Sequence, residues 1–413
     1  MPGIVIIGAG QAGASLAAEA RKLGYAGPIT LIGDEPVAPY QRPPLSKAYL
    51  LGQVGLDRMA LRATSFWGDH GINLKVGRNV TAIVREGGTV RAGAESFHYE
   101  HLVIATGSSA RQLPEAQGGL LQGVYTIRNI ADVDAMAAEF RPDRKFLIVG
   151  GGYIGLEAAA VGAKLGLKVT LIETAPRILQ RVAAAETSNF FRELHLSNGV
   201  DIRENTGLDR LVGTGRVSGA VLSDGTELAV DFAIVGIGIM PRTQLAQEAD
   251  LVIENGIRTD AHGRTSDQHI WAVGDCASFP HEGGRIRLES VGHAIHHGEV
   301  VARNILGTTQ AYEAKPWFWS DQYDLKLQIA GLNAGYDRVV ERTGEEGSRS
   351  IWYYRGDCLL AVDAINDARA YMVGKRILES RHTISPEYVV DAATDVKALI
   401  SRAVPVSAAS TVG

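Results

Sequence analysis

The stretch GIVIIGAGQAG at residues 3–13 decides the fold of this chain. Its β-branched run at 4–7 is typical of a buried parallel strand, and it leads into a turn with glycines at positions 8, 10 and 13. An alanine-rich helix is predicted at 14–23 and a second strand at 29–32, which ends at Gly33-Asp34. Strand, glycine turn, helix and strand together form one βαβ unit of the dinucleotide-binding type.

The same pattern recurs near the middle of the chain. Residues 146–149 predict a strand, GGGYIG at 150–155 a turn, 156–165 a helix, and 169–172 a strand that ends at Glu173. One Gly-x-Gly-x-x-Gly motif alone is weak evidence, but two with the same flanking elements are not. The chain is therefore predicted to contain two nucleotide-binding modules.

The glycines of such a turn have separate roles in holding a pyrophosphate. The first makes the tight turn, the second allows the backbone to approach the phosphates, and the third lets helix and strand pack closely. An acid about 20 residues further on accepts hydrogen bonds from a ribose hydroxyl. The two turns and their acids give the cofactor-binding candidates Gly8, Gly10, Gly13, Asp34, Gly150, Gly152, Ile154, Gly155 and Glu173.

Composition excludes several other classes of protein. The chain has 413 residues, a net charge of −5 and only two cysteines, Cys276 and Cys358. The charge does not suit a general nucleic-acid binder, and two distant cysteines provide neither a disulfide framework nor a Cys-x-x-Cys pair. The first strand begins almost at the first residue, and the short apolar run resembles neither a signal peptide nor a membrane span. We therefore expect a cytoplasmic protein with no membrane partner.

Three further strands, at 102–104, 232–235 and 270–273, each lead into a turn that contains glycine. The third is expected to face the first glycine turn, so the first domain would resume after an inserted second one. Alternating segments after residue 317, followed by a helix near 386–402 and a loosely ordered tail at 403–413, indicate a separate α+β part. The predicted domains are 1–112 with 244–316 for FAD, 113–243 for NAD, and 317–413 at the C-terminus. The fold class is α/β, with two Rossmann-like domains plus the α+β domain.

The two sites receive different cofactors. FAD fits the acceptor that is bound tightly, and the non-repeating segment 36–52 could cover a flavin, so we assign FAD to the first site and NADH to the second. The Glu173 carboxylate favours NADH over NADPH because it repels a 2′-phosphate. Arg177 and Arg181 could weaken that preference, or they could be solvated charges on a helix.

With these motifs in hand, the chain resembles the FAD-dependent NADH:ferredoxin reductases of oxygenase systems. This is the group of putidaredoxin, rhodocoxin and dioxygenase ferredoxin reductases, and the resemblance covers residues 1 to about 400. It also implies a glutathione-reductase-like arrangement of the two Rossmann-like domains. The supporting strings are RPPLSK at 42–47, ATG at 105–107, GYIGLE at 152–157, VGDC at 273–276 and WFWSDQ at 317–322.

This resemblance implies further site residues. On the FAD side they are Ala12 by the pyrophosphate, Arg42 and Lys47 toward the flavin, Val80, Arg128, Asp275 by the ribityl chain and Val291 by the pyrimidine end. On the nicotinamide side they are Gly236 and Ile237; Arg181, which follows Glu173 closely, is a further cofactor-binding candidate. Lys47 and Glu157 would face each other near the flavin, and Trp319 would lie where the redox partner approaches, so these three are the catalytic candidates.

Simpler roles are open for several of these residues. Lys47 could be a surface lysine, Glu157 a helix-surface acid and Asp275 a turn cap, while Trp317 and Trp319 could be core aromatics. Cys276 is expected to be a small buried packing residue. His293, His296 and His297 share one helix face, but no acid or cysteine completes a metal site, so no metal is predicted.

The predicted reaction passes a hydride from NADH to FAD and then delivers single electrons to a 2Fe-2S ferredoxin that serves a monooxygenase or dioxygenase. A disulfide relay is excluded because the chain has no cysteine pair. A basic patch near Trp319 is expected for an acidic ferredoxin, with Lys315, Lys326 and Arg338 as candidates by sequence proximity. Alternatives are an NADH oxidase, a rubredoxin reductase, or a redox-responsive interaction protein like the apoptosis-inducing flavoprotein. The chain is expected to be a monomer or a weak homodimer.

Overall fold

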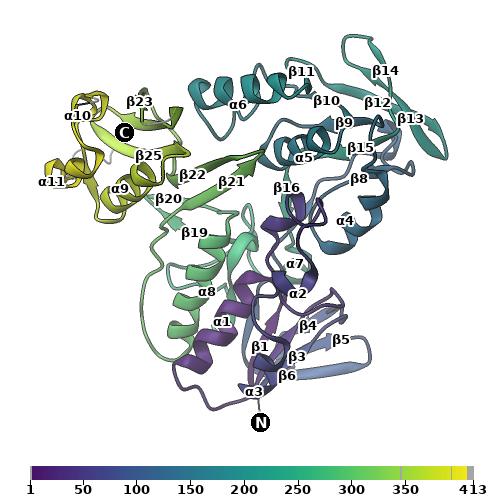
Figure 1. The fold of residues 1–413 in the computed structure, drawn as a ribbon. Coiled ribbons are helices and arrows are strands. Elements are labelled where there is room, and N and C mark those ends of the chain that lie inside the picture. The colour runs from purple at the N-terminus through teal and green to yellow at the C-terminus, as the bar shows by residue number, and fades with distance from the viewer. Residues whose placement is uncertain (1, 345–346, 392, 407–413) are drawn as a thin grey trace. The chain divides into compact units, whose positions relative to one another are not determined.

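The computed structural model describes residues 2–344, 347–391 and 393–406. The chain forms two compact units, which are described separately (Figure 1). The first unit comprises residues 1–41, 55–109 and 240–316, and the second comprises 42–54, 110–239 and 317–413. Short strands β7 (Ser108–Ala110) and β16 (Ile239–Pro241) contain two of the points where the chain passes from one unit to the other. The three domains expected from the sequence remain a prediction.

A parallel sheet is the centre of the first unit. Its strands lie in the order β3, β2, β1, β6, β18, and every neighbouring pair is parallel. The bounds are β1 (Gly3–Ile7), β2 (Ile29–Ile32), β3 (Ile72–Lys75), β6 (Glu95–Ile104) and β18 (Ile270–Ala272). Two antiparallel strands extend the sheet: β5 (Thr89–Ala92) pairs with the first half of β6, and β4 (Ala82–Val84) pairs with β5. The carboxyl ends of the parallel strands therefore share one edge, where α/β sheets bind ligands.

Two helices pack side by side on one face of this sheet, α1 (Gln11–Lys22) and α8 (Val291–Ile305) (Figure 1). A Cβ on Gly298 would come within 2.7 Å of the carbonyl oxygen of Ala12, so glycine allows the two backbones to approach. Short elements complete the unit: α2 (Leu56–Met59), α3 (Thr64–Asp69), α7 (Gln244–Glu248), β17 (Ile257–Arg258), β19 (Ala277–His281) and β20 (Gly284–Ile286).

The second unit contains a similar parallel sheet. Its order is β11, β10, β9, β15, β8, with bounds β8 (Val124–Tyr125), β9 (Lys145–Val149), β10 (Lys168–Ile172), β11 (Asp201–Arg203) and β15 (Phe232–Val235). Phe146 and Phe232 stack at 4.5 Å between ring centroids on neighbouring strands. The associated helices are α4 (Ile130–Met136), α5 (Tyr153–Lys164) and α6 (Ala185–Ser197), and a separate sheet is formed by β12 (Leu208–Thr214), β13 (Arg216–Leu222) and β14 (Glu227–Ala229).

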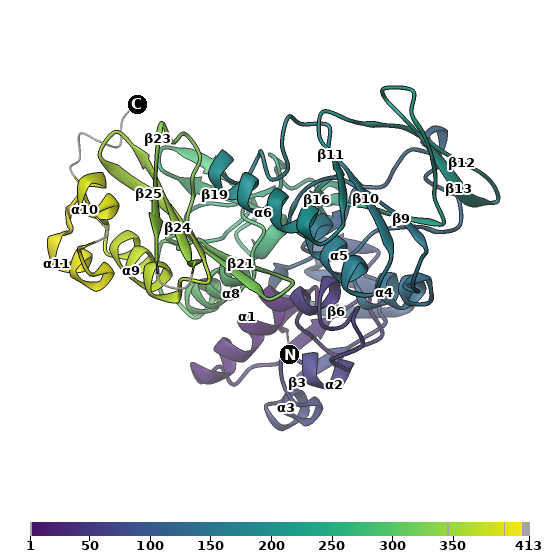
Figure 2. The same ribbon diagram turned by 45° about the horizontal axis from the view of Figure 1, so that its top comes forward.

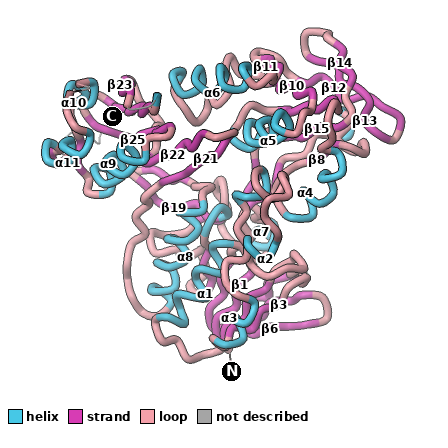
Figure 3. The backbone as a smooth tube through the Cα atoms, viewed as in Figure 1, coloured by secondary structure: helices cyan, strands magenta, loops and turns pink. Residues whose placement is uncertain are grey.

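An antiparallel sheet follows in the same unit, in the order β21, β22, β25, β24, β23. Figure 2 labels four of these strands, β21, β25, β24 and β23. The bounds are β21 (Trp317–Gln322), β22 (Leu325–Gly331), β23 (Arg338–Thr343), β24 (Arg349–Arg355) and β25 (Cys358–Ile365). Helix α9 (Ala368–Glu379) covers one face of it (Figure 3). A Cβ on Gly374 would come within 2.6 Å of the Val362 side chain, so the helix lies close to the sheet.

The single helix predicted near 386–402 is wrong. The structure has two short helices there, α10 (Pro386–Val390) and α11 (Leu399–Arg402). Asp391 and Asp395 interrupt the run, because each carboxylate accepts a backbone N–H two residues further on. In the tail, β27 (Val404–Pro405) pairs with β26 (His382–Thr383), and the rest of the expected loose tail, 407–413, lies outside the described residues. Among the described helices, not one has the length and apolar character needed to cross a bilayer.

Candidate active site

The first glycine turn lies between β1 and α1. A Cβ on Gly8 would come within 2.1 Å of the Ala105 carbonyl oxygen, and one on Gly13 would come equally close to the carbonyl oxygen of Gly8. Gly8 also has a φ of +115°, which a side chain would strain. A Cβ on Gly10, in contrast, would meet nothing within 4 Å. The fold requires two of the three glycines, and the middle one borders open space.

The second turn repeats this geometry residue by residue. A Cβ on Gly150 would lie 2.4 Å from the Gly236 carbonyl oxygen, and one on Gly155 would lie 2.2 Å from that of Gly150. Gly152 again has nothing within 4 Å, and Ile154 is exposed on the first turn of α5. Each turn thus leaves a bare backbone and space at the start of a helix, which is the arrangement that a pyrophosphate requires. These residues fit FAD and NAD.

Both predicted acids follow their strands as expected. The Asp34 carboxylate pairs with the Arg242 guanidinium at 2.9 Å, and both side chains are about half exposed. The Glu173 carboxylate accepts hydrogen bonds from the backbone N–H groups of Gly151, at 2.7 Å, and Ala175, at 2.8 Å. Glu173 is therefore held against the second glycine turn. No sequence motif pointed to Arg242, which is distant from Asp34 along the chain.

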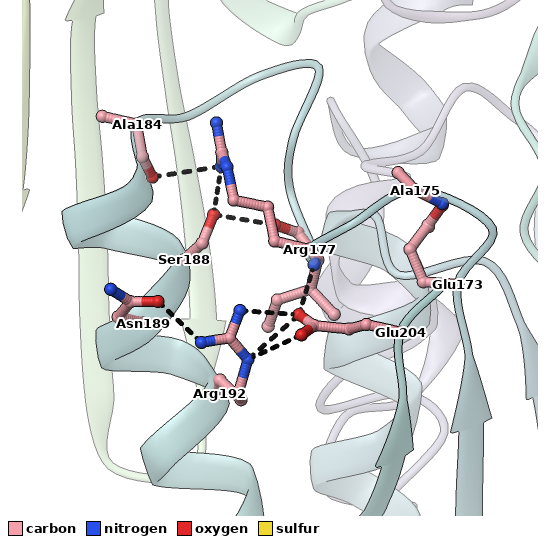
Figure 4. Close-up of polar contacts among 9 residues, drawn as sticks. Glu173, Ala175, Arg177, Ala184, Ser188, Asn189, Arg192 and Glu204 are labelled. Carbon is pink, nitrogen blue, oxygen red and sulfur yellow. Dashed lines mark hydrogen bonds and ion pairs between the residues drawn. The ribbon is translucent and has the colours of Figure 1, made fainter. Parts of the chain in front are cut away.

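The residues after Glu173 form a loop, so the helix expected there is wrong, but the alternative of a solvated charge stays open for Arg181, which is exposed. The Arg177 guanidinium donates to the Ser188 hydroxyl at 2.5 Å and to the Ala184 carbonyl at 3.2 Å (Figure 4). Arg177 thus connects the loop to the start of α6, whereas Arg181 is exposed on the loop.

Lys47 and Glu157 form an ion pair, with 3.1 Å between Nζ and Oε1. Glu157 lies on α5 and is only 5% exposed. The hydroxyls of Ser46 and Ser320 donate to its two carboxylate oxygens at 2.5 and 2.6 Å. Burial raises the pKa of Glu157, while Lys47 and the two hydroxyls act in the opposite direction. The alternatives of an unpaired surface lysine and a helix-surface acid are therefore wrong.

Trp319 lies beside this ion pair, on β21. The Lys47 ammonium is 5.6 Å from the centroid of the Trp319 ring, and the Trp319 ring stacks on that of Trp317 at 5.5 Å. Both tryptophans are half-buried rather than enclosed in a core. Lys47 also approaches the Asp321 carboxylate at 3.5 Å. Ser46, Ser320 and Asp321 were missed as site residues although they stand inside the strings RPPLSK and WFWSDQ.

The first unit places Asp275 in the short turn that follows β18, at the same sheet edge as the first glycine turn. The Ser108 hydroxyl donates to its carboxylate at 2.8 Å, and Gly274 before it has a φ of +72°. Val291 begins α8, which the Ser290 hydroxyl caps, and Val80 is buried in the core below β1. Ala12 lies buried at the start of α1.

In the second unit, the Arg42 guanidinium donates to the Arg128 carbonyl at 2.7 Å. The backbone N–H of Arg128 donates to Asp132 at 2.8 Å, so the start of α4 fixes this segment. Gly236 and Ile237 follow β15 and border the second glycine turn. The structure thus brings Gly236 together with Gly150, and Lys47 together with Glu157 and Trp319.

The two cysteines are free thiols. Cys276 is buried and donates to the Val273 carbonyl at 3.3 Å, and burial raises the pKa of its thiol. Such a thiol is a poor nucleophile at neutral pH. His293 and His297 are also buried on α8, and over residues 2–344, 347–391 and 393–406 no group of three or more His, Cys, Asp or Glu residues is placed to hold a metal ion.

Comparison with known proteins agrees with this geometry. A family model described as pyridine nucleotide-disulphide oxidoreductase matches residues 2–298, and one described as reductase C-terminal matches 317–400. The chain is 46% identical to a ferredoxin–NAD(P)(+) reductase of Sphingomonas sp. (93% of this chain, 94% of the relative) and 39% identical to rhodocoxin reductase of Rhodococcus erythropolis (97% and 94%). A crystal structure of a covalent putidaredoxin reductase–putidaredoxin complex is similar with a TM-score of 0.93 at 37% identity, covering 97% of this chain and 98% of that one.

These matches confirm the predicted fold class, two Rossmann-like parts followed by a C-terminal α+β part. Each match covers nearly the whole of this chain and nearly the whole of the related protein. The family uses FAD and a nicotinamide nucleotide, in agreement with the two open glycine turns. The chain therefore belongs to the pyridine nucleotide-disulphide oxidoreductase family and is an FAD-dependent oxidoreductase of the ferredoxin reductase type.

Proposed function

We propose that this protein takes electrons from NADH, holds them on FAD and delivers them singly to a 2Fe-2S ferredoxin that serves a monooxygenase or dioxygenase. The observation that carries the proposal is the repeated glycine turn with an open middle glycine, at Gly10 and at Gly152, in a chain with no cysteine pair. Similarity to ferredoxin reductases over nearly the whole chain supports the choice of acceptor.

FAD is proposed to lie at the first glycine turn, where Gly8, Gly10 and Gly13 shape the backbone and Asp34 and Asp275 provide carboxylates at the same sheet edge. Bound FAD supplies the chemistry that accepts an electron pair as hydride and releases electrons one at a time. Ser108 orients Asp275 through its hydrogen bond, and Arg242 holds Asp34. Val80 and Val291 stay predictions as further contacts of the flavin.

Nucleotide choice is proposed to depend on Glu173. Its carboxylate lies at the second glycine turn, where it would bind a ribose 2′-hydroxyl and repel a 2′-phosphate. Of the two nearby cations, Arg177 is engaged by Ser188 and Ala184, and Arg181 is exposed on the same loop. NADH is therefore the proposed donor, with Gly150, Gly152, Ile154, Gly155, Arg181, Gly236 and Ile237 as the proposed contacts.

The ion pair is proposed to serve the flavin through Lys47. A lone lysine would favour a negatively charged reduced flavin, but here the carboxylates of Glu157 and Asp321 offset its charge. Lys47 is thus fixed in position by Glu157, which Ser46 and Ser320 fix in turn. Arg42 and Arg128 remain proposed contacts of FAD.

Electrons are proposed to leave near Trp319, because the buried, protonated Cys276 and the distant Cys358 do not form a dithiol relay. Of the candidate docking cations, Lys326 is exposed and lies opposite Asp321 in the β21–β22 register. Arg338 is on β23, at the other edge of that sheet from β21, so it is a poor candidate for a patch around Trp319.

Stopped-flow spectroscopy tests the proposed function. Anaerobic NADH should reduce the bound FAD, and oxidised 2Fe-2S ferredoxin should then reoxidise it faster than air does. Rapid turnover in air without a protein acceptor would instead indicate an NADH oxidase, and preference for rubredoxin over ferredoxin would indicate a rubredoxin reductase. A long-lived reduced complex with ligand-driven dimerisation would indicate a redox-responsive interaction protein.

The proposal includes a cytoplasmic location and a monomer or weak homodimer. Two free thiols, Cys276 and Cys358, support a reducing compartment. Sedimentation at two protein concentrations, with and without NADH, tests the oligomeric state. A tight dimer at both concentrations would contradict it.

A further inference from the structure

Strand β25 carries an acid that the proposed electron path does not use. The side chain of Asp363 is fully buried, and among the described residues it forms no ion pair. One of its carboxylate oxygens accepts from the Tyr353 hydroxyl at 2.5 Å and from the Thr187 hydroxyl at 2.8 Å. A buried carboxylate without a cation is costly, and the two hydroxyl groups offset part of that cost.

Asp363 orients the O–H group of Tyr353. Because that hydroxyl donates its hydrogen bond to Asp363, its oxygen is available as an acceptor, and the backbone N–H of Ala184 donates to it at 3.0 Å. Ala184 precedes the first turn of α6 and has no side-chain oxygen to cap it. Thr187, in the first turn of α6, donates to the same carboxylate. Tyr353 on β24 and Asp363 on β25 therefore anchor the start of α6 at two points.

The start of α6 in turn holds the loop after Glu173 (Figure 4). The Ala184 carbonyl accepts from the Arg177 guanidinium at 3.2 Å. The Ser188 hydroxyl accepts from the same guanidinium and donates to the Ile178 carbonyl at 2.7 Å. Two residues of the α6 start thus fix both the side chain of Arg177 and the backbone after it.

That loop lies directly on the second glycine turn. The backbone N–H of Leu179 donates to the Gly151 carbonyl at 2.9 Å. A Cβ on Gly151 would come within 2.8 Å of the buried Ile178 side chain, so the loop packs against the turn without a gap. Arg181, a proposed nucleotide contact, is exposed on the same loop. A continuous series of contacts therefore leads from Asp363 to Gly151.

We infer that Asp363 and Tyr353 are positioning residues for NADH: through Ala184 and Thr187 they hold loop 174–184 against the second glycine turn. Neither side chain is exposed, so both act through the loop and not by contact with the nucleotide. The inference rests on the proposed binding of NADH at this turn. It assigns to the C-terminal sheet an influence on nucleotide affinity that is separate from any role of Trp319.

Tyr353→Phe tests this with the least disturbance, because it removes one hydroxyl and leaves the ring. Loss of a buried hydrogen bond that orients the loop is expected to weaken nucleotide binding about fivefold. The readouts are calorimetric affinity for NAD⁺, which does not require turnover, and anaerobic stopped-flow reduction at varied NADH. The affinity should fall while the limiting rate of flavin reduction and the FAD content stay close to the wild-type values.

A matched control is offered by the next residue on β24. Tyr354 is equally buried, and among the described residues its hydroxyl has no hydrogen-bond partner. Tyr354→Phe should therefore bind NAD⁺ as the wild type does. The inference would be overturned if the Tyr353→Phe and Tyr354→Phe proteins had the same NAD⁺ affinity, whether both bound as wild type or both bound more weakly.

Two further variants separate positioning from charge. Asp363→Asn keeps an oxygen that accepts from Tyr353 and Thr187, so its NAD⁺ affinity should stay within about twofold of wild type. Asp363→Leu removes the acceptor and should weaken binding at least as much as Tyr353→Phe. Normal affinity in Asp363→Leu, or a loss in Asp363→Asn as large as in Asp363→Leu, would overturn the assigned role.

If Tyr353→Phe does not fold, Thr187 decides the matter. Thr187→Ser retains the hydroxyl and should bind as wild type, whereas the nearly isosteric Thr187→Val should bind about threefold more weakly. Equal binding by the two would contradict the inference. A wild-type protein that binds no NAD⁺ would contradict the proposed function itself, so the two failures are distinguishable.

Discussion

At the scale of single residues, the glycine turns separate what folding requires from what a ligand requires. Gly8, Gly13, Gly150 and Gly155 have no room for a side chain, since a Cβ would collide with backbone atoms at 2.1 to 2.4 Å. Gly10 and Gly152 have ordinary backbone angles, with φ of −92° and −82°, and open surroundings. Nothing in the packing of the described residues explains why these two positions are glycine. A ligand that approaches the backbone does.

This difference predicts that Gly10→Ala and Gly152→Ala each lose affinity for a different cofactor. Both variants should fold with stability within about 1 kcal/mol of wild type, because the new methyl meets no described atom. Gly10→Ala should lose FAD affinity by at least about tenfold, measured by reconstitution of the apoprotein. Gly152→Ala should retain FAD and lose NADH affinity instead. Loss of FAD in both variants, or in neither, would contradict the assignment of the two sites.

Glu173 gives a prediction about nucleotide preference. Glu173→Ala should reduce the ratio of kcat/KM for NADH to that for NADPH by about tenfold or more, because the carboxylate no longer repels a 2′-phosphate. Glu173→Arg should reduce it further. Steady-state kinetics with both nucleotides measures the ratio, and Glu186→Ala, an exposed acid on α6, is the control. An unchanged ratio would remove Glu173 from its proposed role.

Asp363 gives a prediction about stability and pH. Burial raises the pKa of Asp363 from 3.8 to about 6, so the folded state binds this proton more tightly than the unfolded state. Its contribution to stability is complete below pH 4 and is lost as the pH rises through 6. Asp363→Asn lacks this loss, so its free energy of unfolding relative to wild type should increase by about 2 kcal/mol between pH 4.5 and 7.5.

Urea unfolding of the two proteins at each pH measures this difference. Asp57→Asn, which changes an exposed acid, serves as the control for general effects of charge. A difference that is constant across this pH range would show that Asp363 titrates in the folded protein as it does in the unfolded one.

At the scale of elements, the strands and helices that were predicted correctly are those that local sequence patterns determine. The strands and helices around both glycine turns are confirmed, because apolar periodicity and glycine position are local properties. Helix α9 was missed. A single helix near 386–402 was predicted, but it is interrupted because the carboxylates of Asp391 and Asp395 accept hydrogen bonds from the backbone nearby. Ser46, Ser320 and Asp363 were missed because their roles depend on partners far away in the sequence. No local pattern identifies such partners.

Strand β21 carries the prediction for electron delivery. Trp319→Ala should slow reduction of ferredoxin by about tenfold or more while reduction of FAD by NADH changes little, because a half-buried tryptophan is the kind of side chain that dominates a docking interface. Stopped-flow measurement of the two half-reactions separates them. Trp317→Ala, which removes the stacked neighbour, controls for loss of packing on the same strand. Equal slowing of both half-reactions would assign Trp319 a structural role.

At the scale of the whole molecule, the chain combines two nucleotide modules with a C-terminal sheet and lacks the dithiol after which its family is named. Resemblance to ferredoxin reductases predicted the pairing of Lys47 with Glu157, which the structure shows at 3.1 Å. It did not predict that Asp363 and Tyr353 link the C-terminal sheet to loop 174–184. The cofactor sites thus follow local sequence motifs, whereas the contacts that support them join residues far apart in the sequence.

An anaerobic titration of the purified protein with NADH, followed by visible spectroscopy, tests the central claim most directly. The protein should be yellow, its flavin absorption should bleach with about one equivalent of NADH, and oxidised 2Fe-2S ferredoxin added afterwards should restore it. A colourless protein that takes up no flavin on reconstitution, or a flavin that NADH leaves oxidised, would contradict the account.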